Sequence, residues 1–318
     1  MKKIHILIIM FLTYYSTSYS DNSNGGGLRW EITGMGIERP SYLLGTSHGI
    51  CNTFLDSIVG FHDAFDSVEQ LIIESVSEEY GKYVKQSSYM PVDSTYENLL
   101  SKEDLLLLNE KMELFFSKNG ANELKNVKPS VLIFLIQGQV VNKLYIEAGI
   151  APTNPPCNSF IDKYIENKAK DAKYKIIGLD EECDAFFNRM PISTDLKKLI
   201  ELLKDEDFFN DESKKKETLE RIISNKDSMD KYYKLQNLKK LEELIDNQKQ
   251  YISKDLYAEQ EVNLMGNNRN NRWMKKIPAL IKNRASLVAV GAAHLVGETG
   301  LICQLRSLGY KVEPIKEL

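Results

Sequence analysis

The 318-residue chain carries 41 basic and 45 acidic side chains, 42% hydrophobic residues and only 4 histidines. It is long enough to bury a large core, and its near balance of charge, without a long basic patch, argues against a nucleic-acid partner. The 4 cysteines stand at wide, irregular spacing, which excludes a compact zinc module. The length suits one large domain or two small ones, and no low-complexity linker divides the chain.

The first twenty residues have the order of a secretory signal peptide. Lys2 and Lys3 precede an apolar run that is short for a membrane span, and Ser18 and Ser20 supply a small-x-small cleavage pattern. We therefore expect removal of residues 1–20 and export of a mature chain, 21–318, to the periplasm, the cell surface or the medium. This mature form would have no stable membrane span. An uncleaved anchor is the alternative.

Two strands and a helix are expected next along the chain. Leu28–Ile32 alternates as an edge strand does, and Ser41–Gly45 has the pattern of a buried strand. Residues 55–65 repeat apolar side chains at helical spacing, which predicts one helix with His62 on its apolar face. A histidine there is expected to pack in the core rather than to bind a ligand.

Acidic residues follow two further predicted strands. Leu71–Ile73 is a buried strand followed by Glu74, and Tyr174–Leu179 is a strand followed by Asp180. A buried strand has no structural need to end in a charge, so Glu74 is a candidate site residue. A solvated strand end is the alternative for Glu74.

A long helical stretch separates these strands from the end of the chain. It runs from about residue 93 to 268, with one helix capped by Ser101 and another from Lys128 to Gly149. Residues 151–156 (APTNPP) predict an extended linker within it. We expect this helical insertion to form a cap over one edge of a sheet.

The last sixty residues repeat a pattern from the start of the mature chain. Leu287–Gly291 is a buried strand that ends at glycine and is followed by His294, just as Gly45 is followed by His48. With 18 glycines and 4 histidines in 318 residues, chance gives about a quarter of one such Gly-x-x-His match. Two of these GxxH motifs behind strands therefore indicate one site at the strand ends, where ligands of open α/β sheets gather. Histidines that tie loops to backbone carbonyls are the structural alternative.

These pieces together resemble the TraB/GumN (PrgY-like) family, which includes the Tiki-type metalloproteases. The resemblance is carried by PSYLLGTSH at 40–48, LIIE at 71–74, GLD at 178–180, RN at 269–270, RWM at 272–274 and VAVGAAHLVGETGL at 288–301. It implies a single α/β domain over residues 21–318, with a central mixed β-sheet flanked by helices and the helical insertion at about 93–268, of the kind shared with erythromycin-esterase and ChaN-like proteins. For Tiki members it implies a divalent-metal-dependent peptidase. The family usually has Gly-Leu-Glu where this chain has Asp180, which puts the role of that acid in doubt.

The chemistry expected of such a site is hydrolysis. His48, His294 and Glu74 are the predicted ligands of a divalent metal ion (Mn, Co or Zn) that would activate water. Glu74, Asp180 and Arg269 are the predicted catalytic residues, with Arg269 stabilising a tetrahedral intermediate or holding a substrate carboxylate. Ser47 invites a nucleophilic reading, but no Gly-x-Ser-x-Gly elbow surrounds it.

The expected partner is a peptide or protein substrate. The first alternative is a protein of the same fold that binds and sequesters a peptide or signal without cutting it, and the second is a metal-dependent esterase. The cysteines add one expectation, a disulfide between Cys157 and Cys183, which flank one helix and strand. Cys51, three residues after His48, is an alternative soft metal ligand.

Overall fold

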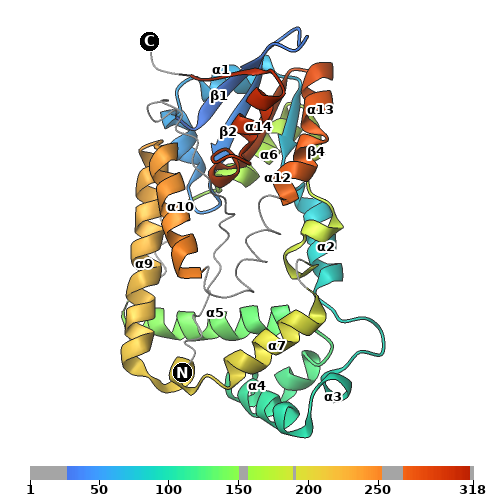
Figure 1. Cartoon of the computed structure of the whole chain (residues 1–318), viewed down its shortest axis with the longest axis vertical. Coiled ribbons are helices and arrows are strands. Elements are labelled where there is room, and N and C mark those ends of the chain that lie inside the picture. Colours follow the sequence, from blue (N-terminus) through green and yellow to red (C-terminus); the bar gives the residue numbers. More distant parts are fainter. Residues whose placement is uncertain (1–26, 150–156, 189–190, 253–267, 316–318) are drawn as a thin grey trace. The chain divides into compact units, whose positions relative to one another are not determined.

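The computed structural model describes residues 27–149, 157–188, 191–252 and 268–315 (Figure 1). The predicted signal peptide, 1–20, and the predicted linker, 151–156, lie outside these residues. The strands are β1 (Arg29–Thr33), β2 (Ser41–Thr46), β3 (Gln70–Ile73), β4 (Lys175–Gly178), β5 (Ser286–Gly291) and β6 (Lys311–Pro314).

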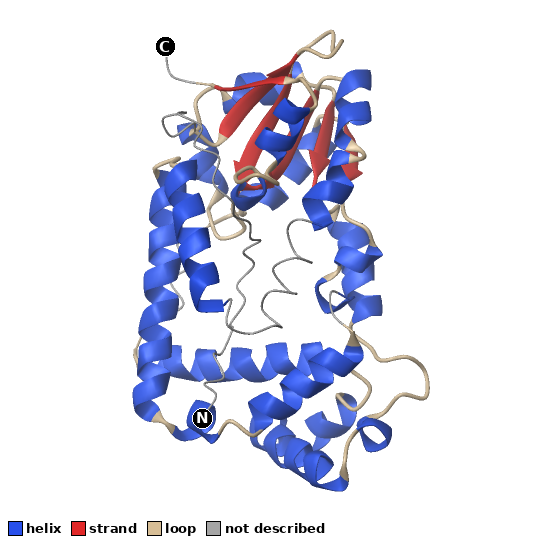
Figure 2. Cartoon of the chain, viewed as in Figure 1, coloured by secondary structure: helices blue, strands red, loops and turns tan. Residues whose placement is uncertain are grey.

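Helices account for most of the remaining described residues (Figure 2). The α-helices are α1 (Phe61–Ser67), α2 (Ser77–Ser87), α3 (Tyr96–Leu99), α4 (Lys102–Glu123), α5 (Pro129–Glu147), α6 (Ile161–Asp171), α7 (Ile192–Leu203), α8 (Glu206–Asn210), α9 (Glu212–Lys234), α10 (Leu238–Ile252), α12 (Asn268–Met274), α13 (Ile277–Asn283) and α14 (Leu301–Ser307). The short 3-10 helices are η1 (Asn52–Ser57), η2 (Glu182–Asp184), η3 (Phe186–Asn188) and η5 (Ala292–His294).

The six strands form one mixed sheet in the order β4-β3-β5-β2-β1-β6. β4, β3, β5 and β2 are parallel, whereas β1 runs antiparallel to both β2 and β6. The expected α/β fold with a central mixed sheet is therefore confirmed. The prediction that β1 is an edge strand is wrong, because the C-terminal strand β6 pairs with its outer side. β1 is accordingly buried at Trp30 and Ile32.

The described chain divides into two compact units. The sheet unit contains all six strands and comprises the described residues within 11–79, 155–184 and 226–318. Its core lies between the sheet and its helices, with fully buried side chains such as Leu71 of β3, Val288 of β5, Ile165 of α6 and Leu305 of α14. Near-continuous apolar strands such as LVAV of β5 are what a parallel sheet covered on both faces requires.

The helical unit comprises the described residues within 80–154 and 185–225 and has a core of its own. Ser101 caps α4 as predicted, because its Oγ accepts a hydrogen bond from the Asp104 backbone N–H at 3.1 Å. Among the described helices, α5 is long and apolar enough to cross a bilayer, but Leu132 and Ile136 of α5 lie in the core of this unit. Length and apolar composition alone do not distinguish a membrane-spanning helix from a helix buried in a protein core. That the helical insertion caps the sheet stays a prediction.

The single helix expected over residues 55–65 is wrong, and so is the buried position expected for His62. Gly60 adopts a left-handed conformation (φ 64°) between η1 and α1, which breaks the helical phase. Phe61 and Phe65 then form the buried face of α1, and the His62 side chain is 51% exposed and hydrogen-bonds Asp56 at 2.9 Å. His62 is a surface residue.

Candidate functional site at the strand ends

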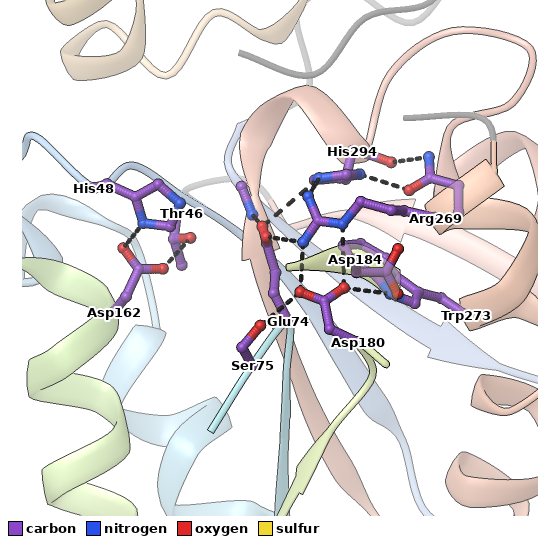
Figure 3. A network of polar contacts seen from close by, with 12 residues as sticks. Thr46, His48, Glu74, Ser75, Asp162, Asp180, Asp184, Arg269, Trp273 and His294 are labelled. Atoms are coloured by element: carbon purple, nitrogen blue, oxygen red, sulfur yellow. Dashed lines mark hydrogen bonds and ion pairs between the residues drawn. The ribbon is translucent and has the colours of Figure 1, made fainter. Parts of the chain in front are cut away.

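The parallel register brings the predicted site residues to one edge of the sheet. Thr46 of β2 pairs with Gly291 of β5, and Ile73 of β3 pairs with both Ala289 of β5 and Gly178 of β4. These four strands therefore end together. The residues that follow them are His48, Glu74, Asp180 and His294 (Figure 3).

Arg269 of α12 connects three of these four residues (Figure 3). Its Nε and Nη2 donate to the two Asp180 carboxylate oxygens at 3.1 and 2.8 Å, and Nη2 also donates to Glu74 Oε2 at 2.6 Å. Its Nη1 lies 3.2 Å from His294 Nε2, and its guanidinium lies 4.7 Å from the centre of the Trp273 ring. Both edges of the guanidinium fork thus face acceptors of the protein itself.

The opposite charges of this network stabilise one another's ionised forms. Burial raises the pKa of Glu74, but the charges of Arg269 and His48 and the Gly291 N–H outweigh it and hold the Glu74 pKa well below its usual range. Burial lowers the pKa of Arg269, but Glu74 and Asp180 outweigh this and raise it. Arg269 is 4% exposed, so its charge is stable there only because two carboxylates accompany it.

Asn270 orients His294. The Asn270 amide nitrogen donates to the carbonyl oxygens of His294 and Thr299, which directs its Oδ1 at His294 Nδ1, 2.6 Å away. His294 Nδ1 must therefore carry a proton and donate it, and Nε2 faces the Arg269 Nη1 donor. The ring is 2% exposed and lies against Trp273, with 4.4 Å between ring centres. Arg269, Asn270 and Trp273 come from one helix turn of α12, which the RN and RWM pieces of the sequence encode.

Asp180 is fully engaged in the network despite its shorter side chain. Besides Arg269, it accepts hydrogen bonds from Ser75 Oγ at 2.5 Å and Trp273 Nε1 at 3.1 Å. Its backbone N–H donates to the Glu74 carbonyl at 2.8 Å, so β3 and β4 remain linked beyond their last paired residues. These contacts make Asp180 the anchor of Arg269.

His48 lies at the same edge of the sheet but has a different partner (Figure 3). Its Nδ1 is 2.9 Å from Asp162 Oδ2, and Asp162 Oδ1 accepts a hydrogen bond from Thr46 Oγ1 at 2.6 Å. The hydrogen bond to Asp162 raises the pKa of His48 to about 9, against the lowering effect of burial. The His48 side chain is 53% exposed, so water screens this pair.

The cysteine predictions are wrong. Cys51 forms a disulfide with Cys157, across a sequence separation of 106 residues, and Cys183 and Cys303 are thiols. The pairing of Cys157 with Cys183 was inferred from their positions around one helix and strand, but the sheet places the loop after β2 beside the start of α6. A disulfide sulfur also removes Cys51 as a thiolate metal ligand.

The predicted metal ligands do not fit a divalent ion in this arrangement. His294 Nε2 and Glu74 Oε1 are 3.7 Å apart, but the Arg269 guanidinium already faces the Nε2 lone pair and Glu74 Oε2. The hydrogen bond between His48 Nδ1 and Asp162 is itself compatible with metal binding through Nε2, so the position of Arg269 is what disfavours the metal. Within the described residues, no group of three or more His, Cys, Asp or Glu stands close enough to hold a metal ion.

Several residues of the site were missed from the sequence. Asp162, Ser75, Asn270 and Trp273 each hydrogen-bond a predicted site residue, and Thr46 hydrogen-bonds Asp162. Asn270 and Trp273 stand in the RN and RWM pieces beside Arg269, which was a usable signal. Asp162 had none, because an acid in the first turn of a helix is common for helix-dipole reasons alone.

Fold and site together define an α/β protein with a buried polar network at the carboxyl ends of four parallel strands. The TraB/PrgY/gumN family profile matches residues 28–314. The chain therefore belongs to the TraB/PrgY/gumN family. Comparisons with curated proteins and with solved structures found no match.

Proposed function

We propose that the sheet unit is a hydrolase that acts on a carbonyl group of a peptide. The observation that carries the proposal is the pairing of each strand-end histidine with its own orienting residue, His48 with Asp162 and His294 with Asn270. An aspartate partner alone does not mark a functional histidine, because the surface residue His62 also has one. His48 and His294 differ from His62 in that they follow neighbouring strands that end beside a buried arginine with two carboxylates. Perturbed titratable groups that gather at one place are typical of functional sites.

His48 is the group best suited to move a proton. Its Nδ1 is held by Asp162 and half of its side chain is exposed to solvent, where a substrate and water have access. Because the pKa of His48 is about 9, the ring is mostly protonated at neutral pH, and the neutral form that can accept a proton becomes more abundant as the pH rises toward 9. In that form the ring would take a proton from water at Nε2 as the water attacks the carbonyl, and the resulting imidazolium would return it to the leaving group. Asp162 would stabilise the imidazolium and fix the ring orientation.

Glu74, Arg269 and His294 support this step rather than perform it. Glu74 is a weak base, because its pKa is low and both of its carboxylate oxygens accept hydrogen bonds, from Gly291 N–H at 2.7 Å and Arg269 at 2.6 Å. The Arg269 fork faces Asp180, Glu74 and His294, so it does not clamp a substrate carboxylate in this arrangement. Its positive charge would still favour negative charge developing nearby.

A peptide-binding protein without catalysis is the second candidate. It is favoured by the same observation that makes Glu74 a weak base: Arg269 already pairs with Glu74 and Asp180, so these carboxylates are engaged within the protein. An ester substrate is a further alternative within the hydrolase proposal, since attack of water on either carbonyl makes the same demands on His48. Export after cleavage of residues 1–20 would bring the protein to extracellular or periplasmic substrates.

A substrate screen separates these functions. The purified mature chain, 21–318, is incubated with peptide and ester libraries, with and without manganese, cobalt or zinc, and products are identified by mass spectrometry. We expect peptide cleavage that does not require added metal. Saturable peptide binding without cleavage would support the binding protein instead, and cleavage only after metal loading would show that Arg269 leaves His294 and Glu74 for the metal.

A further inference from the structure

The Cys51–Cys157 disulfide lies next to the His48–Asp162 pair. Cys51 follows His48 by three residues, Cys157 precedes Asp162 by five, and the two cysteine Cα atoms are 5.6 Å apart. The hydrogen-bonded pair and the disulfide therefore join the same two segments, the loop after β2 and the chain entering α6.

These two segments are also joined by the hydrogen bond from Thr46 Oγ1 to Asp162 Oδ1 at 2.6 Å and by a short backbone pairing. Asn52 N–H donates to the Ser159 carbonyl at 2.9 Å and Ile161 N–H donates to the Ile50 carbonyl at 3.1 Å, around an isolated bridge between Cys51 and Phe160. Two backbone hydrogen bonds are a weak tie between segments so distant in sequence, since each exchanges with water at little net gain. The covalent bond is the strong link.

The surrounding elements are held independently of this disulfide. Ile161 and Ile165 of α6 are completely buried in the core of the sheet unit, as are Leu43 and Leu44 of β2. Breaking the disulfide is therefore expected to loosen the loop that carries His48, while α6 and the sheet keep their places. The effect would concentrate on the His48 ring, which is half exposed and held by Asp162 at 2.9 Å.

We propose that the Cys51–Cys157 disulfide is a positioning element for His48, so that the His48–Asp162 pair forms only in the oxidised protein. An exported chain would then have its proton-transfer group in place after oxidation, and a reducing compartment would hold it out of place. The expected loss of hydrolysis on reduction rests on the proposed function. The expected displacement of the His48 ring on reduction is independent of that function.

The test compares the oxidised protein, the same protein reduced with TCEP, and the C51A/C157A and D162N variants. Ring resonances of His48 are recorded by NMR, with His294 as an internal control because Asn270 holds it on the other GxxH motif. We expect reduction and C51A/C157A to move the His48 resonances to those of D162N and to leave His294 unchanged. TCEP reduction of the folded protein gives the same answer if C51A/C157A fails to fold.

A second control removes the other cysteines. C183S/C303S lacks the two thiols outside the disulfide and should respond to TCEP as the wild type does, whereas C51A/C157A should not respond. In the hydrolysis assay we expect reduction to lower kcat by about 100-fold, the order of loss that small misplacement of a catalytic group causes. Unchanged His48 resonances after complete reduction would overturn the proposal. A moved His48 ring in a protein without hydrolase activity would keep it and reject the proposed function.

Discussion

Replacing Arg269 by methionine tests the buried network most severely. Met keeps much of the side-chain volume but removes the donors that face Glu74, Asp180 and His294 at 2.6–3.2 Å. The Asp180 side chain is 3% exposed and that of Glu74 is 15% exposed, so water reaches neither carboxylate freely. Removing one partner of a buried ion pair costs about 3–5 kcal/mol, and we expect a loss of that size in the free energy of unfolding at pH 7.

The loss should depend on pH in a defined direction. In the wild type the pKa of Glu74 is lowered from 4.5, so this residue stabilises the fold above that pH, and its contribution is lost as the pH falls through the lower folded value. Without Arg269, burial disfavours the ionised carboxylate and Glu74 takes up a proton at higher pH. The difference between wild type and R269M should therefore shrink from pH 7 to pH 4.

Urea unfolding followed by tryptophan fluorescence measures this difference. Both tryptophans of the chain, Trp30 and Trp273, belong to the sheet unit, so the signal reports the unit that carries the network. R39M is the matched control, because Arg39 pairs with Glu69 of the same unit but both side chains are exposed, at 54% and 47%. R39M should lose far less than R269M. A loss below about 1 kcal/mol for R269M, or a loss independent of pH, would show that the fold does not need Arg269 to neutralise the buried carboxylates.

Three further predictions concern the histidines and the N-terminus. The pKa of His48, measured by NMR, should lie near 9 and fall toward 6.5 in D162N, and stability from this pair should be complete below pH 6.5 and lost as the pH rises through about 9. A His48 pKa that D162N does not change would contradict this. H62A should alter the free energy of unfolding by no more than about 0.5 kcal/mol, because the His62 side chain is 51% exposed. A larger loss of stability would show that His62 packs in the core after all. N-terminal sequencing of the exported protein should begin near Asp21, and retention of Met1 would reject cleavage.

The strand ends were predictable because their sequence signal is local. A buried parallel strand is a continuous apolar run, and the residue after it lies at the edge where the neighbouring strands also end. This rule placed His48, Glu74, Asp180 and His294 correctly from spacing alone. Apolar periodicity failed at His62, because one left-handed glycine reset the helical phase.

The contacts between distant segments were not predictable from spacing. Asp162 is 114 residues from His48, and Cys157 is separated from Cys51 by 106 residues. Both contacts depend on where α6 packs within the sheet unit, and no local sequence pattern predicts that position. The partners of Arg269 were likewise not predictable, because Glu74 and Asp180 are 195 and 89 residues away from it in the sequence.

The most direct test of the account is the hydrolysis rate of H48A and H294A on a substrate from the screen. Each variant is first shown to be folded by tryptophan fluorescence, and H62A is the matched control. General acid-base groups contribute about 10²–10⁴-fold, so H48A should lose at least 100-fold in kcat, H294A should also lose rate, and H62A should match the wild type. Folded H48A and H294A proteins that cleave at the wild-type rate would contradict the assignment of the strand-end site.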